Sequence, residues 1–109
     1  EFRITEDTGA SNLTVEQQGG GLLLTWEPTE GAEIDNFLIL RALNDKLDID
    51  NMDHHLNSIP GSASPEYLDE TASPMTTYYY GIIEYIGGSP GQLSEPVPGV
   101  MDVNEWRMY

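Results

Sequence analysis

The chain has 109 residues, which suits one domain with a single hydrophobic core, and it contains no cysteine for disulfides or thiolate chemistry. Nineteen acidic residues stand against four basic ones, so the formal net charge is −15. Such a surface repels phosphate backbones and anionic lipid headgroups, so we expect neither nucleic acid nor a membrane as a partner.

Glycine and proline, 11 and 7 residues, interrupt the chain at short intervals. Apolar residues between them alternate with a period of two, which is typical of many short β-strands. We expect residues 1–11 to be a linker or an entering arm and residues 13–17 to form the first strand. Residues 22–26 form the second, with Leu22, Leu24 and Trp26 on one face, and residues 34–42 form the third.

The second half of the chain is less regular. Residues 50–56 favour either one helical turn or an irregular approach to a short strand at 56–59. Further strands are expected around 67–68 and at 76–86. A hairpin loop at 87–91 then leads to a last strand at 93–101, where Pro96 and Pro98 mark a sheet edge. Residues 102–109 are expected to be an exiting linker, and the domain to span residues 12–101.

Three motifs carry a resemblance to a known family. The first is Leu22-x-Leu24-x-Trp26 followed by Pro28, and the second is the alternating stretch from Ile34 to Arg41. The third is the series Tyr67-Leu68, Pro74, Thr76 and Tyr78. Together they resemble the B strand, the C strand and the tyrosine corner of fibronectin type III domains, most closely the bacterial type of secreted and cell-surface proteins.

The resemblance implies an all-β fold, a seven-stranded antiparallel β-sandwich of Greek-key topology. It also implies that Tyr78 is the corner tyrosine, which returns its hydroxyl to the backbone upstream. With period two, the expected structural core comprises Trp26, Phe37, Ile39, Tyr78, Tyr80 and Ile82. Glu84 departs from this pattern, because a buried unpaired carboxylate is costly. Either it reaches water at the end of the sandwich, or Gly81 forms a bulge that reverses the alternation.

The face opposite the core suggests a binding surface. Apolar side chains on neighbouring strands would point outward there, and clustered exposed apolar residues often mark an interface. The candidate interface residues are Leu38, Leu40, Tyr79, Ile83 and Tyr85. The alternative is that the segment after residue 42, or the tail with Trp106 and Met108, folds over them.

An acidic stretch offers a weak candidate for a metal site. Calcium binds clustered oxygen ligands, and Asp45, Asp48, Asp50 and Asp53 stand close together in sequence. The EF-hand pattern fails, so a solvated acidic loop is the alternative and we expect no cofactor. His54 and His55 are adjacent, so on a strand their side chains would point apart.

The sequence contains no P-loop and no H-E-x-x-H motif, so we expect no enzyme. The resemblance implies a non-catalytic extracellular module that spaces or presents neighbouring domains of a larger secreted or cell-surface protein and contacts other proteins. One alternative is a recognition module that binds a protein or a glycan, with Tyr79, Tyr85, Trp106 and Tyr109 as stacking candidates. A weaker alternative is a linker stiffened by calcium.

Overall fold

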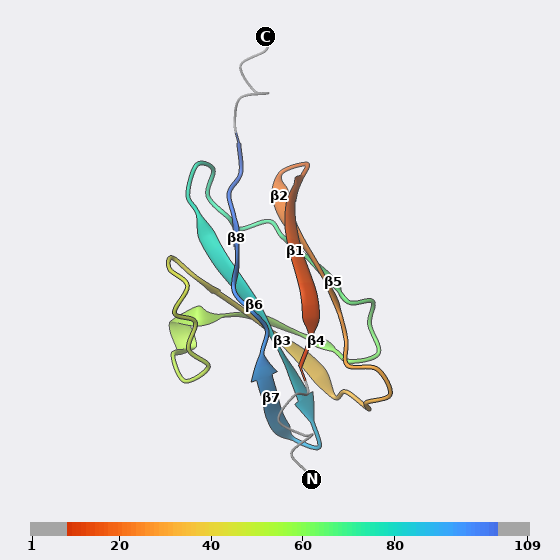
Figure 1. The fold of residues 1–109 in the computed structure, drawn as a ribbon. Coiled ribbons are helices and arrows are strands. Elements are labelled where there is room, and N and C mark those ends of the chain that lie inside the picture. Colours follow the sequence, from red (N-terminus) through yellow and green to blue (C-terminus); the bar gives the residue numbers. More distant parts are fainter. Residues whose placement is uncertain (1–8, 103–109) are drawn as a thin grey trace.

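The computed structural model describes residues 9–102, which form two antiparallel sheets packed face to face (Figure 1). The smaller sheet has the spatial order β1 (Ser11–Gln18), β2 (Gly21–Glu27) and β5 (Glu66–Asp69). The larger sheet has the order β4 (His55–Pro60), β3 (Asn36–Ala42), β6 (Tyr78–Ile86) and β7 (Ser89–Leu93), and β8 (Val97–Gly99) pairs with β6 as well. The all-β antiparallel sandwich is therefore as predicted.

The strand count is eight, not the predicted seven. The expected last strand at 93–101 contains only the final residue of β7 and all of β8, and the gap between them includes Pro96, which has no N–H to donate to a ladder. β7 pairs with the second half of β6 and β8 with its first three residues. The expected loop at 87–91 is also shorter. Gly87 and Gly88 make the turn with φ values of 63° and 83°, and β7 begins directly after them.

For residues 50–56 the sequence left two alternatives open, a helical turn or an irregular approach to a short strand, and the structure contains both. A short 3-10 helix, η2 (Met52–His54), follows an irregular loop and leads directly into β4. The side chain of Asn51 caps this helix by accepting a hydrogen bond from the Asp53 amide. Within residues 9–102, no helix is long and apolar enough to cross a membrane.

The main core lies between the two sheets and is built by alternate residues of β2, β3 and β6. Trp26 and Phe37 meet edge to face with ring centroids 5.3 Å apart. Ala10, which was expected in the entering arm, is buried as well. The buried apolar residues of this cluster are Ala10, Leu13, Leu22, Leu24, Trp26, Phe37, Ile39, Ala72, Tyr80, Ile82 and Met101.

Candidate functional site

The outer face of β3 and β6 carries the predicted interface, and the structure corrects that prediction. Leu40 is fully buried, and Leu38 and Ile83 are only 7% and 3% exposed. These three residues form a second hydrophobic cluster, on the side of the larger sheet that faces away from the main core. They are therefore not available as contact residues, and the alternative of a covering segment is the one observed.

The cover comes from two directions. Leu47 and Ile49 lie in the loop between β3 and η2, Leu93 lies at the end of β7, and all three pack on the cluster. Gly81 of β6 lies directly beneath the side chains of Leu47 and Leu93. A Cβ atom built on Gly81 would stand 2.8 Å from the Cδ1 atoms of both Leu47 and Leu93. The absence of a side chain at this position thus lets the loop and the strand pack closely over β6.

A groove remains open where the two covering elements meet. It has a volume of about 310 Å³, and its lining residues are Leu47, Asp48, Ile49, Ile83, Pro90, Gly91 and Leu93. Its wall is mainly apolar, with the exposed Asp48 at the rim. Of the five predicted contact residues, Ile83 alone lines this groove, and the rest of the wall comes from the covering loop and from β7.

The two described tyrosines proposed for stacking lie far apart. Tyr79 pairs with Ala42 and Tyr85 with Asn36, at opposite ends of the β3–β6 ladder. Six residues of strand separate them by about 20 Å. Both are half-buried, and Tyr85 packs against the outer cluster. They do not form one platform, and the other two candidates, Trp106 and Tyr109, lie outside the described residues.

Most of the residues expected in the main core are buried there. Phe37, Ile39, Tyr80 and Ile82 are fully buried and Trp26 is 4% exposed. The Nε1–H of Trp26 is buried and has no hydrogen-bond partner among residues 9–102. Tyr78 differs from the others, because it is half-buried at the margin of the core. Its hydroxyl oxygen accepts a hydrogen bond from the Ser73 amide at 3.1 Å, the backbone return expected of a corner tyrosine.

Tyr80 leads to a polar network that sequence reasoning missed. Its hydroxyl donates to the fully buried Asp69 at 2.6 Å, and Arg41 donates to the same carboxylate oxygen at 2.8 Å. The other oxygen accepts from the amide and the hydroxyl of Thr71. The only sequence signal was an aspartate at the end of a predicted strand, and aspartates are abundant in this chain.

The network perturbs the ionisation of its members. Burial alone would raise the pKa of Asp69, but hydrogen bonds from Thr71 and Tyr80, together with Arg41, outweigh it and lower that pKa. Burial and the hydrogen bond to Asp69 both raise the pKa of Tyr80. The hydrogen bond from Ser73 lowers the pKa of Tyr78. These shifts belong to a structural network that joins β3, β5 and β6.

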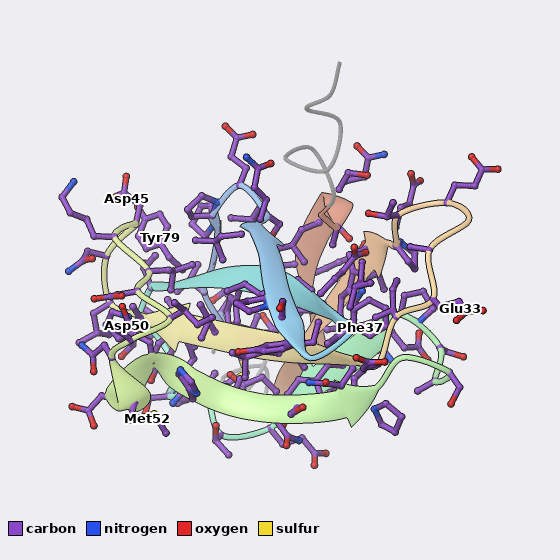
Figure 2. All side chains as sticks on the ribbon, turned by 90° about the horizontal axis from the view of Figure 1, so that it is seen from below. Glu33, Phe37, Asp45, Asp50, Met52 and Tyr79 are labelled. Atoms are coloured by element: carbon purple, nitrogen blue, oxygen red, sulfur yellow. The ribbon has the colours of Figure 1, made fainter. Side chains whose placement is uncertain are left out.

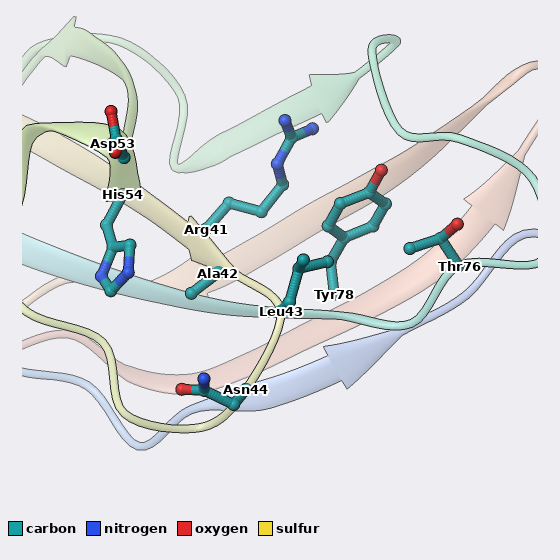
Figure 3. Close-up of a pocket in the computed structure, with 8 residues that line it drawn as sticks. All are labelled: Arg41, Ala42, Leu43, Asn44, Asp53, His54, Thr76 and Tyr78. Carbon is teal, nitrogen blue, oxygen red and sulfur yellow. The ribbon is translucent and has the colours of Figure 1, made fainter.

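An open cleft lies beside this network. It measures about 560 Å³ and is lined by Arg41, Ala42, Leu43, Asn44, Asp53, His54, Thr76 and Tyr78 (Figure 3). The Arg41 guanidinium lies over the Tyr78 ring, 4.5 Å from its centroid. Because the guanidinium also pairs with buried Asp69, its charge is already compensated. The cleft therefore does not present an unpaired cation to an anionic ligand.

Glu84 is the second buried carboxylate, and both alternatives for it are wrong. It is fully buried, and β6 stays in continuous register with β3 through Gly81. Its two oxygens accept from the backbone amide and the hydroxyl of Thr29 at 2.7 and 2.8 Å. Gly9 donates to the same threonine hydroxyl. The carboxylate thus ties the start of the described chain to the loop after β2.

The four aspartates considered for calcium do not converge. Figure 2 shows Asp45 and Asp50 on the loop beside η2, away from the interior position of Phe37. Asp48 Oδ1 accepts from the Asp50 amide, and Asp45 approaches Lys46 at 4.0 Å. No group of three or more potential ligands that could hold a metal ion occurs within residues 9–102.

The two histidines hold the same loop in place. His54 Nδ1 lies 3.0 Å from the Asp48 amide nitrogen. An amide nitrogen can only donate, so Nδ1 is the acceptor and carries no proton. His55 Nε2 lies 2.6 Å from the Ile49 carbonyl oxygen, so there the imidazole donates. Both rings thus support the segment that covers the outer cluster.

Comparison with known proteins identifies the fold. No protein-family model and no curated protein sequence matches the chain. An Fn3-like protein from Clostridium thermocellum is 16% identical, with a TM-score of 0.69 over 85% of this chain and 91% of that one. A human FNIII domain is 19% identical, with a TM-score of 0.64 over 94% and 86%. A structure of titin domains is 17% identical, with a TM-score of 0.67 over 87% of this chain and 32% of the other.

At these identities the comparisons establish the fold alone. The chain has a fibronectin type III-like fold, as its tryptophan strand and tyrosine corner predicted.

Proposed function

We propose that this chain is a non-catalytic module of a larger secreted or cell-surface protein. There it spaces or presents neighbouring domains and makes protein–protein contacts, with no cofactor. The observation that supports this most is the fold itself. The same fold is one unit among several in a titin kinase structure with flanking domains, where the match covers 18% of that chain. Because this fold occurs in unrelated proteins, it favours an architectural role over a specific chemistry.

The course of the chain supports a spacing role. Gly9 precedes β1 at one end of the sandwich, and Asp102 lies beside Gln17 at the other end of the same strand. Eight residues of strand span about 25 Å. Segments joined to this domain before and after it are thus held apart by the length of the sandwich (Figure 1).

The open groove between Leu47, Ile49 and Leu93 is the contact surface that the geometry favours. Its apolar wall offers burial to one or two side chains, and burial of apolar surface contributes roughly 25 cal/mol per Å². The acidic loop beside it selects against partners with an acidic surface and favours basic ones.

Fractionation of the source tests the module. An antibody raised to this domain should detect a protein far larger than 12 kDa in the medium or at the cell surface. A 12 kDa protein in the cytoplasm would contradict both the extracellular setting and the spacing role.

Amide hydrogen exchange tests the groove. Amides of residues 47–49 and 89–93 should exchange more slowly in the parent protein than in the isolated domain. Ile49→Ser should remove that difference. Met52→Ser is the matched control, because Met52 is 72% exposed on the same segment but does not line the groove. Equal exchange in parent and isolated domain would rule the groove out as a contact.

A further inference from the structure

One tripeptide near the start of β1 has the form that N-linked glycosylation requires. Asn12-Leu13-Thr14 is an asparagine, a residue other than proline and a threonine. No other asparagine of the sequence is followed two positions later by serine or threonine. Because the motif alone is frequent by chance, its position in the fold decides whether it is a suitable site.

The backbone presents Asn12 outward. The register between β1 and β2 slips between Ser11 and Thr14, as in a β-bulge, and Asn12 has a φ of 54°. Asparagine tolerates this left-handed conformation better than most residues. Asn12 is exposed, whereas the next residue, Leu13, turns into the main core and is 8% exposed.

The hydrogen bond of the Asn12 side chain is compatible with modification. Nδ2 donates to Glu27 Oε1 at 2.8 Å. A primary amide nitrogen has two hydrogens, and a glycosylated one keeps a single hydrogen. That remaining hydrogen is enough for the bond to Glu27, so a glycan on Nδ2 need not disturb the fold.

The surroundings leave room for a sugar. β1 is an edge strand whose second half is closed off, because Gly99 of β8 packs on Val15 and the backbone of Asp102 bonds to the Gln17 side chain. Its first half borders an open depression of about 340 Å³. The lining residues are Ala10, Ser11, Asn12, Leu13, Ser94, Glu95 and Val97.

Among the edges formed by residues 9–102, this half of β1 is also the least protected. Edge strands expose unpaired backbone groups, and proline is one device that blocks pairing with another chain. Pro60, Pro90 and Pro98 lie in β4, β7 and β8, and Pro65 directly precedes β5. β1 contains no proline over its eight residues. A glycan on Asn12 would shield the exposed part of that edge.

We propose that Asn12 is an N-glycosylation site. In the reaction, Nδ2 bonds to C1 of the reducing-end sugar of an oligosaccharide carried on a lipid diphosphate. The C1–O bond breaks, the lipid diphosphate leaves, and Nδ2 loses one proton. The inference depends on the proposed extracellular function, because the transfer takes place on exported chains.

Mass spectrometry of the native protein tests the site. The full protein is isolated from the medium or surface fraction of its source and digested. The peptide that contains Asn12 should carry hexose-type mass increments, and amidase release of the glycan should convert Asn12 to aspartate. A surface or medium protein with unmodified Asn12 would overturn this inference while leaving the proposed function intact. A protein found only in the cytoplasm, with Asn12 unmodified, would overturn both.

Three variants of the native protein separate the motif from the fold. Thr14→Ala should abolish the modification and Thr14→Ser should retain it. Thr25→Ala is the matched control, because the Thr14 and Thr25 hydroxyls are bonded to each other at 2.6 Å. It removes the same hydrogen bond but leaves the tripeptide complete, so the glycan should persist. Loss of the glycan in Thr25→Ala would show that the hydroxyl pair, and not the motif, governs the modification.

Discussion

The two hydrophobic clusters of this domain differ in how they are assembled. The main core lies between two sheets, and β2, β3 and β6 each contribute alternate residues to it. The outer cluster has regular strands on one side only, where Leu38, Leu40 and Ile83 lie. Its other side is a loop and one end of β7, held by imidazole and side-chain–backbone hydrogen bonds. The main core is thus enclosed by secondary structure on both sides, whereas the outer cluster is enclosed on one side by a loop and a strand end.

This difference predicts a hierarchy of stability. Residues of the main core should govern global unfolding, because both sheets pack on them. Residues of the outer cluster should govern local opening of the loop at lower free energy. Three substitutions test this hierarchy.

The largest effect is expected at the centre of the main core. Trp26→Ala should lower the free energy of unfolding by about 3–5 kcal/mol, because it removes the ring that meets Phe37 and leaves a cavity. Urea denaturation of the purified domain measures it. Trp26→Phe should cost clearly less, since the buried Nε1–H has no hydrogen-bond partner to lose in the part of the chain that the structure describes. A cost below about 1 kcal/mol for Trp26→Ala would contradict the central role of this residue.

The second effect concerns the polar network at the margin of the core. Arg41→Met should cost about 1.5–3 kcal/mol, because buried Asp69 loses its cationic partner and keeps only neutral donors. Urea denaturation at neutral pH gives the value. Arg3 lies outside the described residues and cannot serve as the control. The control is Lys46→Met, because the exposed ammonium of Lys46 approaches Asp45 only at 4.0 Å. Equal effects of the two substitutions would show that the Arg41 contact is no stronger than a surface pair.

The same network gives stability a pH dependence at both extremes. The pKa of Asp69 is lower in the folded state, so its contribution is present above the ordinary aspartate value and is lost as the pH falls below about 4. The pKa of Tyr80 is raised, so its contribution is complete below about pH 10 and is lost as the pH rises further. Tyr80→Phe should flatten the alkaline limb of a thermal-denaturation series.

The main core could be predicted from the sequence because the alternation of apolar residues within a strand indicates which of its faces is buried. Leu22, Leu24 and Trp26 alternate on β2, and Tyr80 and Ile82 do so on β6. In a sandwich the period of two is sufficient to assign these positions without knowing which strands are neighbours.

The outer cluster could not be predicted, because its closure depends on contacts between distant segments. Leu38 and Ile83 alternate correctly toward the outer face, but only the path of the loop shows that Leu47 covers that face. The environment of Glu84 could not be predicted for a similar reason. Its partner, Thr29, is 55 residues away in sequence, and nothing local indicates that a loop amide and hydroxyl will meet the carboxylate.

The smallest effect is expected at Gly81, the β6 residue that lies beneath the side chains covering the outer cluster. Gly81→Ala places a methyl group against the Cδ1 atoms of Leu47 and Leu93. Both atoms are ends of flexible side chains, so the cost should be about 1 kcal/mol, at the low end of the range for overpacking. Hydrogen exchange of the loop amides should accelerate more than exchange of β2 and β5 amides.

A double-mutant cycle with Leu47→Ala sharpens this last test. If Leu47 and the new methyl group compete for one space, removing the leucine side chain should make Gly81→Ala nearly neutral, with a coupling energy of about 0.5–1 kcal/mol. Val100→Ala, which lies outside the cluster, should show no coupling. Additive costs for Gly81→Ala and Leu47→Ala, or equal acceleration of exchange in both sheets, would mean that the cover is not a separate unit. The outer cluster would then open only when the whole sandwich unfolds.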